Sequence, residues 1–411
     1  MEDTPGLRIS REDQDFAHTQ PILEGSDTDE AATDVKLALL ASLHPNVDQE
    51  LLLNSLIDAD GSVETADQNI ATLFESKAPN RKRPARQIGH QTSLSFGLQP
   101  HSKRRVLTKR GQTLHLYAPD DVAQHTPCSI IHDFLPSTQA DNLLRELINE
   151  SSSFGRATFK LFDNVVQSPH SACFYVESLA EEQRQKNEYV YNGSFLSDVR
   201  QLTPQMRAVS PKVEVAVNDE IDRRIRTVYP NGQKLRYQSP HRWTPNAAFV
   251  NLYDGAKESV GYHSDQLTYL GPRAVIGSIS LGVAREFRVR KIVAHDDEEV
   301  SSGSRADAEG QIAIHLPHNS LLIMHAEMQE EWKHAVPSST IDAHPIAGNK
   351  RINITYRHYR DSFHPKHTPK CRCNVATVLR CVQRRKETRG RYVWMCHAGN
   401  SPDKQGYDHS H

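Results

Sequence analysis

Between positions 34 and 75, apolar residues recur at helical spacing among polar ones. This pattern predicts three short helices. Pro45 ends the first, Asp48 caps the second, which ends at Gly61, and Ser62 caps the third. The positions predicted to face inward are Val35, Leu39, Leu40 and Leu43 in the first helix, Leu51, Leu52 and Leu56 in the second, and Val63, Ala66, Ile70 and Leu73 in the third.

Further along the chain the apolar period changes from helical to alternating. Helices are predicted at 137–148, capped by Ser137, and from about 202 to 229. The first is lined by Ala140, Leu143, Leu144 and Leu147, and the second has Ile221 and Ile225 on its apolar face. After Trp243, segments rich in β-branched and aromatic residues predict strands at 247–253, 274–281, 286–290, 312–316, 320–324 and 352–359.

Polar stretches separate these regions and indicate where no core can form. Residues 1–32 are acidic and nearly free of aromatic residues, so we expect disorder there and in an acidic insertion at 296–310. Residues 77–110 carry ten Lys and Arg and no Asp or Glu, which is typical of a nuclear localisation signal or a solvated linker. The chain has no membrane-length apolar run and no signal peptide, so we expect a soluble intracellular protein.

The candidate chemistry lies among the predicted strands. His263 and Asp265 are two residues apart, and His334 follows at a distance. Two imidazoles and one carboxylate can bind Fe(II) as a facial triad and leave other positions open. Alternate residues of a strand point to one face, so we expect His263 and Asp265 to reach the same ion. The tripeptide alone is also compatible with ordinary strand residues.

The ordered set of polar residues resembles the AlkB-like branch of the Fe(II)/2-oxoglutarate dioxygenases. That pattern reads Asn-x-Tyr, His-x-Asp, a distant His, then Arg-x-Asn-x-Thr-aromatic-Arg. The resemblance implies an α+β protein with a double-stranded β-helix, or jelly-roll, and oxidative demethylation of nucleic-acid bases that releases formaldehyde and succinate. It also implies iron ligands His263, Asp265 and His334, and a 2-oxoglutarate site from Asn251, Tyr253, Arg351, Asn353 and Arg357.

The same resemblance implies how a substrate would be held, and leaves its identity open. Residues 189–193 resemble the family's nucleotide-recognition lid, so Tyr189 and Tyr191 are expected to contact a single-stranded or flipped base, with Tyr191 stacking on it. Tyr191 could instead be a core or loop tyrosine. Repair members have a carboxylate soon after His-x-Asp, where this chain has residues 266–268, Gln-Leu-Thr. The substrate is therefore a methylated DNA or RNA base, another modified base, or protein.

Flanking segments resemble small binding modules. Residues 33–76 resemble a CUE or UBA ubiquitin-binding domain, matching the CUE turn only at Pro45, so ubiquitin or another partner is expected. After the basic linker 77–112 and a dioxygenase domain 113–362, residues 369–411 resemble a GRF zinc finger. Cys371, Cys373 and Cys396 would bind Zn²⁺, with His409 or His411 as a fourth ligand. The sequence thus predicts a nuclear demethylase, or alternatively a non-catalytic ubiquitin- and nucleic-acid-binding adaptor.

Overall fold

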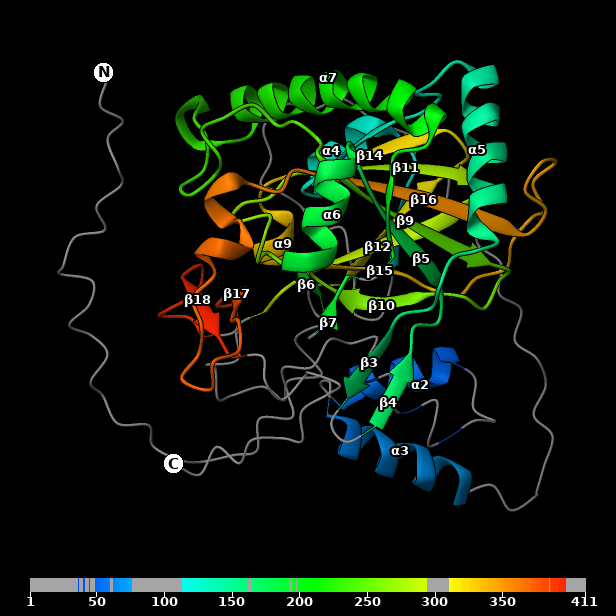
Figure 1. Cartoon of the computed structure of the whole chain (residues 1–411). Helices are drawn as coiled ribbons and strands as arrows, with labels where there is room; N and C mark the ends of the chain where they lie inside the picture. Colours follow the sequence, from blue (N-terminus) through cyan, green and yellow to red (C-terminus); the bar gives the residue numbers. More distant parts are fainter. Residues whose placement is uncertain are drawn as a thin grey trace, which may run out of the picture.

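The computed structural model describes residues 49–59, 62–75, 113–161, 164–191, 194–196, 198–293, 310–383 and 385–396, together with Lys36, Leu40 and His44 (Figure 1). The predicted disordered segment 1–32, residues 296–309 of the predicted insertion, the basic linker 77–112 and both candidate histidines of the tail lie outside these residues. Among the described residues, no helix is long and apolar enough to cross a membrane.

Two of the three predicted N-terminal helices are described in full, α2 (Gln49–Asp58) and α3 (Val63–Glu75). The Ser62 hydroxyl accepts a hydrogen bond from the Thr65 backbone N–H at 3.2 Å, so Ser62 caps α3 as predicted. The His44 imidazole contacts the Asp67 carboxylate at 2.7 Å and ties the preceding turn to α3. The described inward-facing side chains are all buried: Leu40, Leu52, Leu56, Val63, Ala66 and Ile70.

The main body contains two β-sheets that face each other. The seven-stranded sheet has the order β2-β14-β11-β16-β9-β5-β8, and the five-stranded sheet has the order β1-β13-β12-β15-β10. From β9 to β16 the chain passes repeatedly between the sheets, which is the jelly-roll arrangement. The strands of the larger sheet are β2 (Cys128–Ile131), β5 (Ser171–Val176), β8 (Val199–Gln201), β9 (Ala247–Asp254), β11 (Ile276–Gly282), β14 (Ser320–Met324) and β16 (Lys350–Arg357).

The smaller sheet is antiparallel except at one edge, where β1 pairs with β13 in parallel. Its strands are β1 (Thr113–Leu116), β10 (Val260–His263), β12 (Arg285–Lys291), β13 (Gln311–Leu316) and β15 (Trp332–Val336). Phe287 and Val289 are buried while Arg288 and Arg290 are partly exposed, so the predicted alternation in β12 is confirmed. Two further hairpins, β3 (Thr158–Leu161) with β4 (Asn164–Gln167) and β6 (Val190–Tyr191) with β7 (Ser194–Phe195), precede the long helix.

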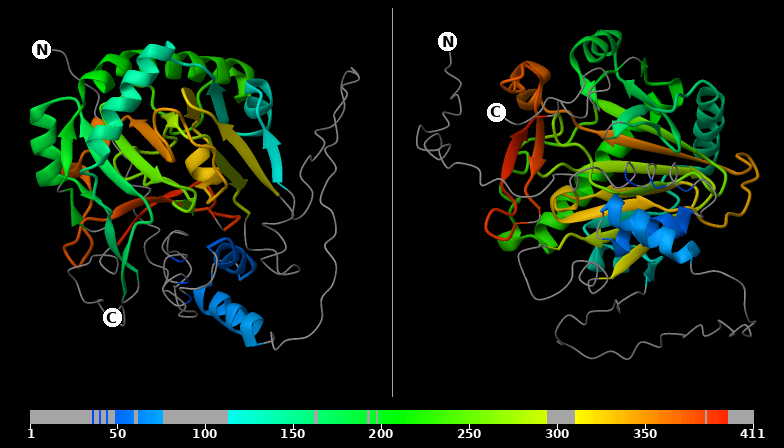
Figure 2. Two further views of the ribbon diagram at one scale, coloured as in Figure 1. Left: turned by 90° about the vertical axis from the view of Figure 1, so that its right-hand side faces the viewer. Right: turned by 90° about the horizontal axis from the view of Figure 1, so that it is seen from below.

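Helices α5 (Ser137–Ser151) and α7 (Pro204–Thr227) cover the outer face of the larger sheet (Figures 1 and 2). The predicted lining residues of α5 are all buried there. The predicted cap is wrong, because Pro136 occupies the cap position, α5 begins with Ser137, and no side-chain hydrogen bond caps the helix. Thr203 caps α7 through its side chain. Two shorter helices, α4 (Pro119–His125) and α6 (Leu179–Glu188), lie before α7 in the chain.

Alternation along β9 and β16 divides their side chains between two environments. Even-numbered residues, such as Val250 and Ile354, belong to the apolar cluster beneath α5 and α7. Odd-numbered residues face the other way, toward the space between the sheets. Their paired positions include Asn251 opposite Asn353 and Tyr253 opposite Arg351. The larger sheet therefore presents a row of polar side chains to the molecule's interior.

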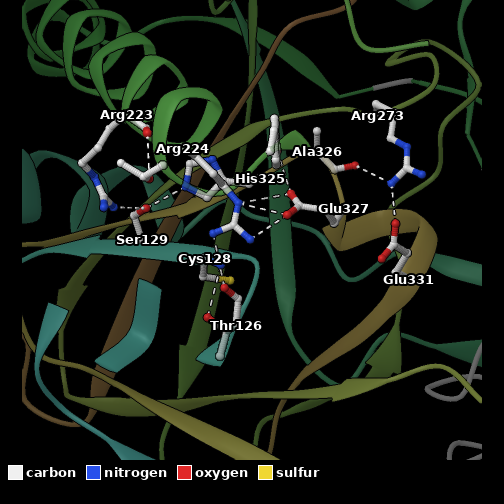
Figure 3. Close-up of polar contacts among 12 residues, drawn as sticks. Thr126, Cys128, Ser129, Arg223, Arg224, Arg273, His325, Ala326, Glu327 and Glu331 are labelled. Carbon is white, nitrogen blue, oxygen red and sulfur yellow. Dashed lines mark hydrogen bonds and ion pairs between the residues drawn. The ribbon is translucent and has the colours of Figure 1, made fainter. Parts of the chain in front are cut away.

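A short helix, α9 (Met328–Glu331), is fixed at both ends by ion pairs (Figure 3). Arg224 on α7 donates to Glu327 just before α9 at 2.6 Å, and both side chains are largely buried. Arg273 donates to Glu331, the last residue of α9, at 2.7 Å. Removing one partner of the buried Arg224–Glu327 pair would be costly, so this pair fixes the start of α9. The more exposed Arg273–Glu331 pair adds a weaker contact at its end.

The C-terminal hairpin of β17 (Val378–Cys381) and β18 (Tyr392–Met395) packs on this same region. Leu379 is 3% exposed and belongs to the apolar cluster that fills the space between the two sheets. The Tyr392 hydroxyl donates to the Glu330 carboxylate of α9 at 2.9 Å. In its described part, the predicted tail 369–411 thus shares a core with the main body. Two 3₁₀ turns, η4 (Asp361–Phe363) and η5 (Pro365–His367), lead into it, and a third, η3 (Pro230–Gly232), follows α7.

Candidate active site

His263 is the last residue of β10 and faces the space between the sheets. Its Nδ1 lies 2.8 Å from the Gly261 carbonyl oxygen. That contact suits an Nδ1–H tautomer, which leaves Nε2 free to bind a metal. Asp265 lies beyond the end of β10, so strand alternation does not place it beside His263. The turn after β10 brings the two side chains together instead. The prediction that His263 and Asp265 meet is thus confirmed, but its explanation by strand alternation is wrong.

The Asp265 carboxylate lies at the centre of a polar cluster. Its Oδ1 is 3.8 Å from His263 Nε2 and 3.4 Å from His334 Nε2, and its Oδ2 accepts from Arg357 Nη2 at 2.6 Å. Burial alone would raise the pKa of Asp265, but Arg357, His334 and His263 outweigh burial and hold that pKa far below its ordinary value. The side chain is therefore a carboxylate with one oxygen directed at two imidazoles.

His334 completes the cluster from β15, directly opposite His263 in the strand register. The two rings lie 4.2 Å apart, and His334 is 5% exposed. Burial, followed by the neighbouring His263, lowers the pKa of His334 to about 4, so this imidazole is neutral at physiological pH. One ligand atom from each of the three residues lies within 4.8 Å of the others. Two imidazoles and a carboxylate so arranged fit a divalent metal such as Fe(II).

Arg351 on β16 places a buried guanidinium on the larger sheet. Its Nη2 donates to the Ser280 hydroxyl at 2.9 Å, and its guanidinium carbon lies 5.2 Å from the Tyr253 ring centre. Within the described part of the chain, its Nε and Nη1 have no hydrogen-bond partner although both are buried. Burial lowers the pKa of Arg351 to about 10. A carboxylate at this buried guanidinium would bond an unsatisfied N–H group and balance the charge, so the position fits a dicarboxylate such as 2-oxoglutarate.

The remaining residues expected around 2-oxoglutarate line the same face of β9 and β16. Asn353 donates to the Ser278 hydroxyl at 2.7 Å, and Asn251 donates to Asn353 at 3.5 Å. The Asn251 side-chain oxygen also contacts His170 at 3.1 Å. Arg357 is committed to Asp265 and lies 5.3 Å over the Phe249 ring, so it orients a candidate metal ligand. The structure thus separates the two arginines into different environments.

The two tyrosines expected to contact a base occupy different surroundings. Tyr189 is 4% exposed and packs in an aromatic cluster with Tyr269 and Tyr359 at 4.6 and 5.6 Å between ring centres. Tyr191 on β6 is partly exposed and lies edge-on to Phe174 at 5.4 Å. Of the two rings, Tyr191 is the one with accessible surface.

The three tail cysteines come together as their spacing predicted. Cys371, Cys373 and Cys396 have sulfur atoms within 4.8 Å of one another, and Cys373 and Cys396 are 3.5 Å apart. Tetrahedral Zn–S bonds of about 2.3 Å would place sulfurs roughly 3.8 Å apart. The cluster is therefore compact enough for a metal ion, while both candidates for a fourth ligand, His409 and His411, lie outside the described residues.

Sequence reasoning missed a residue that positions the metal-binding loop. Gln329 on α9 accepts from the Asp265 backbone N–H at 2.6 Å, and its own carbonyl accepts from Gln383 of the tail at 2.9 Å. His170, which stacks on Tyr253 at 4.9 Å, was also missed, as was Ser280 beside Arg351. None of these lies in a distinctive motif, and only their neighbours in space reveal them.

Comparison with known proteins agrees with this geometry. Residues 127–357 match the family described as the 2OG-Fe(II) oxygenase superfamily, and that range contains the His263–Asp265–His334 cluster and both arginines. The chain belongs to the 2OG-Fe(II) oxygenase superfamily. The cofactors implied by this family, Fe(II) and 2-oxoglutarate, are those that the two sites fit.

Relatives narrow the similarity to the AlkB-like group. The chain is 34% identical over 124 residues to the DNA oxidative demethylase ALKBH2 of Arabidopsis thaliana, covering 27% of this chain and 37% of that protein. It is 35% identical over 124 residues to the alpha-ketoglutarate-dependent dioxygenase alkB homolog 3 of Homo sapiens, and the alignment covers 30% of this chain and 40% of that protein. The match thus spans about two fifths of these relatives. The solved structure of OsALKBH1 aligns with a TM-score of 0.38 at 15% identity. The alignment covers 56% of this chain and 98% of the OsALKBH1 chain.

Proposed function

We propose that this oxygenase removes alkyl groups oxidatively from the bases of DNA or RNA. One observation carries the proposal: a partly buried His-Asp-His cluster and a buried, incompletely bonded Arg351 share the interior of one oxygenase fold. The similarity to proteins named DNA oxidative demethylases supports a nucleic-acid substrate. Fe(II) and 2-oxoglutarate, when bound, would activate oxygen for attack on an N-alkyl carbon, with succinate and formaldehyde as products of demethylation.

The chain's own residues would bind and orient these groups. His263, Asp265 and His334 would hold Fe(II), and Arg357 would keep the Asp265 carboxylate ionised and correctly turned. Arg351 would take the distal carboxylate of 2-oxoglutarate, while the Ser280 hydroxyl accepts from its Nη2. Tyr253, Asn251 and Asn353 would line the remaining wall. The enclosing sheets would exclude water from this space.

Tyr191 would stack on the target base, because its ring is accessible and its neighbours Phe174 and Phe249 support it from behind. Tyr189 would hold the lid in place from within the aromatic cluster rather than lie on the base. The residues after Asp265 give no carboxylate for reading a base edge: Leu267 and Thr268 are 4% and 2% exposed. The nature of the modified base is therefore left to assay.

The flanking regions would deliver the enzyme to its substrate. Residues 33–76 would act as a CUE- or UBA-like ubiquitin-binding unit, and residues 77–112 as a basic nuclear-localisation linker. The tail would bind Zn²⁺ through Cys371, Cys373 and Cys396 in a GRF-like finger. A pocket of about 180 Å³ beside α7 supports nucleic-acid contact, since Lys234, Arg242, Arg273 and Arg360 line it with Asp222 as its acidic member. Such a lining suits phosphate groups.

The deciding experiment measures formaldehyde and succinate from purified protein with Fe(II), 2-oxoglutarate and methylated DNA or RNA oligonucleotides, single- and double-stranded. His263→Ala serves as the inactive control and Tyr191→Ala as the test of stacking. Formaldehyde that requires His263 would establish the demethylase and name its substrate. Succinate without formaldehyde from any oligonucleotide would redirect the search to protein or another base. Absence of both, with no iron bound, would favour the adaptor.

A further inference from the structure

A second group of metal-binding side chains lies on the opposite side of the smaller sheet. His115 is on β1, Glu286 on β12 and His315 on β13, three adjacent strands. Their neighbours along each strand, Leu116, Phe287 and Ile314, belong to the apolar cluster between the sheets. Because side chains alternate, the three polar residues project outward, away from the candidate iron site.

The three donor atoms converge on one point. His115 Nδ1 lies 3.0 Å from His315 Nε2, and Glu286 Oε1 lies 3.5 Å from the first nitrogen and 3.9 Å from the second. Tetrahedral Zn²⁺ with bonds of 2.0–2.2 Å requires ligand atoms about 3.3 Å apart. The observed separations bracket that value, so an ion could enter with small side-chain adjustments.

Neighbouring side chains fix the orientation of these donors. Tyr117 stacks on the His315 ring at 4.1 Å with an interplanar angle of 10°. Arg288 donates from Nε to Glu286 Oε2 at 2.9 Å, which leaves Oε1 toward the imidazoles. Metal-binding carboxylates and imidazoles are commonly oriented by such outer contacts.

We propose that His115, Glu286 and His315 form a Zn²⁺ site that fastens the edge strand β1 to β12 and β13. His115 and His315 are 200 positions apart in the chain, so one ion would join the beginning of the oxygenase body to its centre. Zn²⁺ accepts two imidazoles and a carboxylate and keeps a fourth position for water. An ion bound only by the folded chain would stabilise the fold by mass action.

The test compares metal content and thermal unfolding of the full-length protein and four variants. His115→Gln and His315→Ala each remove an imidazole, Glu286→Gln removes the carboxylate charge, and His367→Ala removes an exposed histidine elsewhere. Each protein is equilibrated with Zn²⁺, dialysed and analysed for bound zinc by mass spectrometry. The His-Asp-His and cysteine clusters are identical in all of them, so differences report this site alone.

We expect His115→Gln and His315→Ala to retain one fewer zinc ion per chain than the wild type and His367→Ala. Glu286→Gln should bind zinc more weakly. Added Zn²⁺ should raise the unfolding temperature of the wild type more than that of His115→Gln. 2-Oxoglutarate turnover should be the same in His115→Gln and the wild type, which excludes misfolding. Equal zinc content and equal stabilisation in all the variants would overturn the proposal, whatever nucleic-acid substrate is found.

Discussion

Arg351 is a buried guanidinium with two nitrogens that no described residue satisfies. A buried polar group without a partner costs about 1–3 kcal/mol, and more when it is charged. The Ser280 hydroxyl and the Tyr253 ring reduce this cost but provide no anion. A protein keeps such a group where a ligand completes its hydrogen bonds, and a carboxylate would also balance its charge.

Replacement of Arg351 by lysine should therefore weaken 2-oxoglutarate binding. Lysine retains the positive charge but loses the planar pair of donors. Loss of a charged hydrogen bond of about 1.5–3 kcal/mol corresponds to a rise in KM for 2-oxoglutarate of roughly tenfold to a hundredfold. This KM is measured from the rate of succinate formation at increasing concentrations of 2-oxoglutarate. Arg290→Lys on the outer sheet face is the matched control, and an unchanged KM in Arg351→Lys would place the carboxylate elsewhere.

For individual residues, the sequence predicted which side chains form the site but not which contacts they make with one another. The resemblance to the AlkB-like pattern implied roles for His263, Asp265, His334 and Arg351, and the structure brings the first three into one cluster. The sequence could not show that Arg357 bonds Asp265, because the approach of the two side chains depends on a turn that joins the two sheets. The sequence expected base contact from both Tyr189 and Tyr191, and the packing of Tyr189 against Tyr269 shows that its ring is buried instead.

Among the elements, the strands that hold the histidines were the least predictable. β10 has four residues and β15 has five, which is too short for alternation to stand out from chance. The longer strands β9 and β16 were predicted to within about two residues, since long apolar runs bounded by polar residues are distinctive. α9, with four residues, gave no signal, although it carries Gln329 beside the metal-binding loop.

The position of α9 leads to a prediction about iron affinity. Gln329→Ala removes the acceptor for the Asp265 backbone N–H and frees the loop that carries this carboxylate. Loss of an outer contact to a metal ligand typically costs tenfold to a hundredfold in affinity. We expect a rise of about tenfold in the dissociation constant for Fe(II), or for Mn(II) as its substitute, in anaerobic titration. Gln201→Ala, at an exposed position of β8, should leave this dissociation constant unchanged. The same dissociation constant in Gln329→Ala and Gln201→Ala would mean that α9 has no positioning role.

For the whole molecule, the boundary between oxygenase body and tail is less sharp than composition suggests. Cysteines and basic residues set residues 369–411 apart in sequence, yet Leu379 packs into the cluster between the two sheets. The Leu379 N–H also donates to the Thr268 hydroxyl, three residues beyond Asp265. A single leucine in a polar tail carries no sequence signal of its destination, so this contact required the structure.

If the hairpin and the body share one core, a change in the tail should destabilise both. Leu379→Ala removes a fully packed side chain and should cost about 2–5 kcal/mol of unfolding free energy in one cooperative transition. Val393→Ala, in the opposite strand of the same hairpin and 40% exposed, should cost less than about 0.5 kcal/mol. Urea unfolding followed by tryptophan fluorescence and by circular dichroism measures both variants. A separate early transition in Leu379→Ala, with the main transition at its wild-type midpoint, would instead show that the tail folds alone and that the loop after Asp265 does not depend on it.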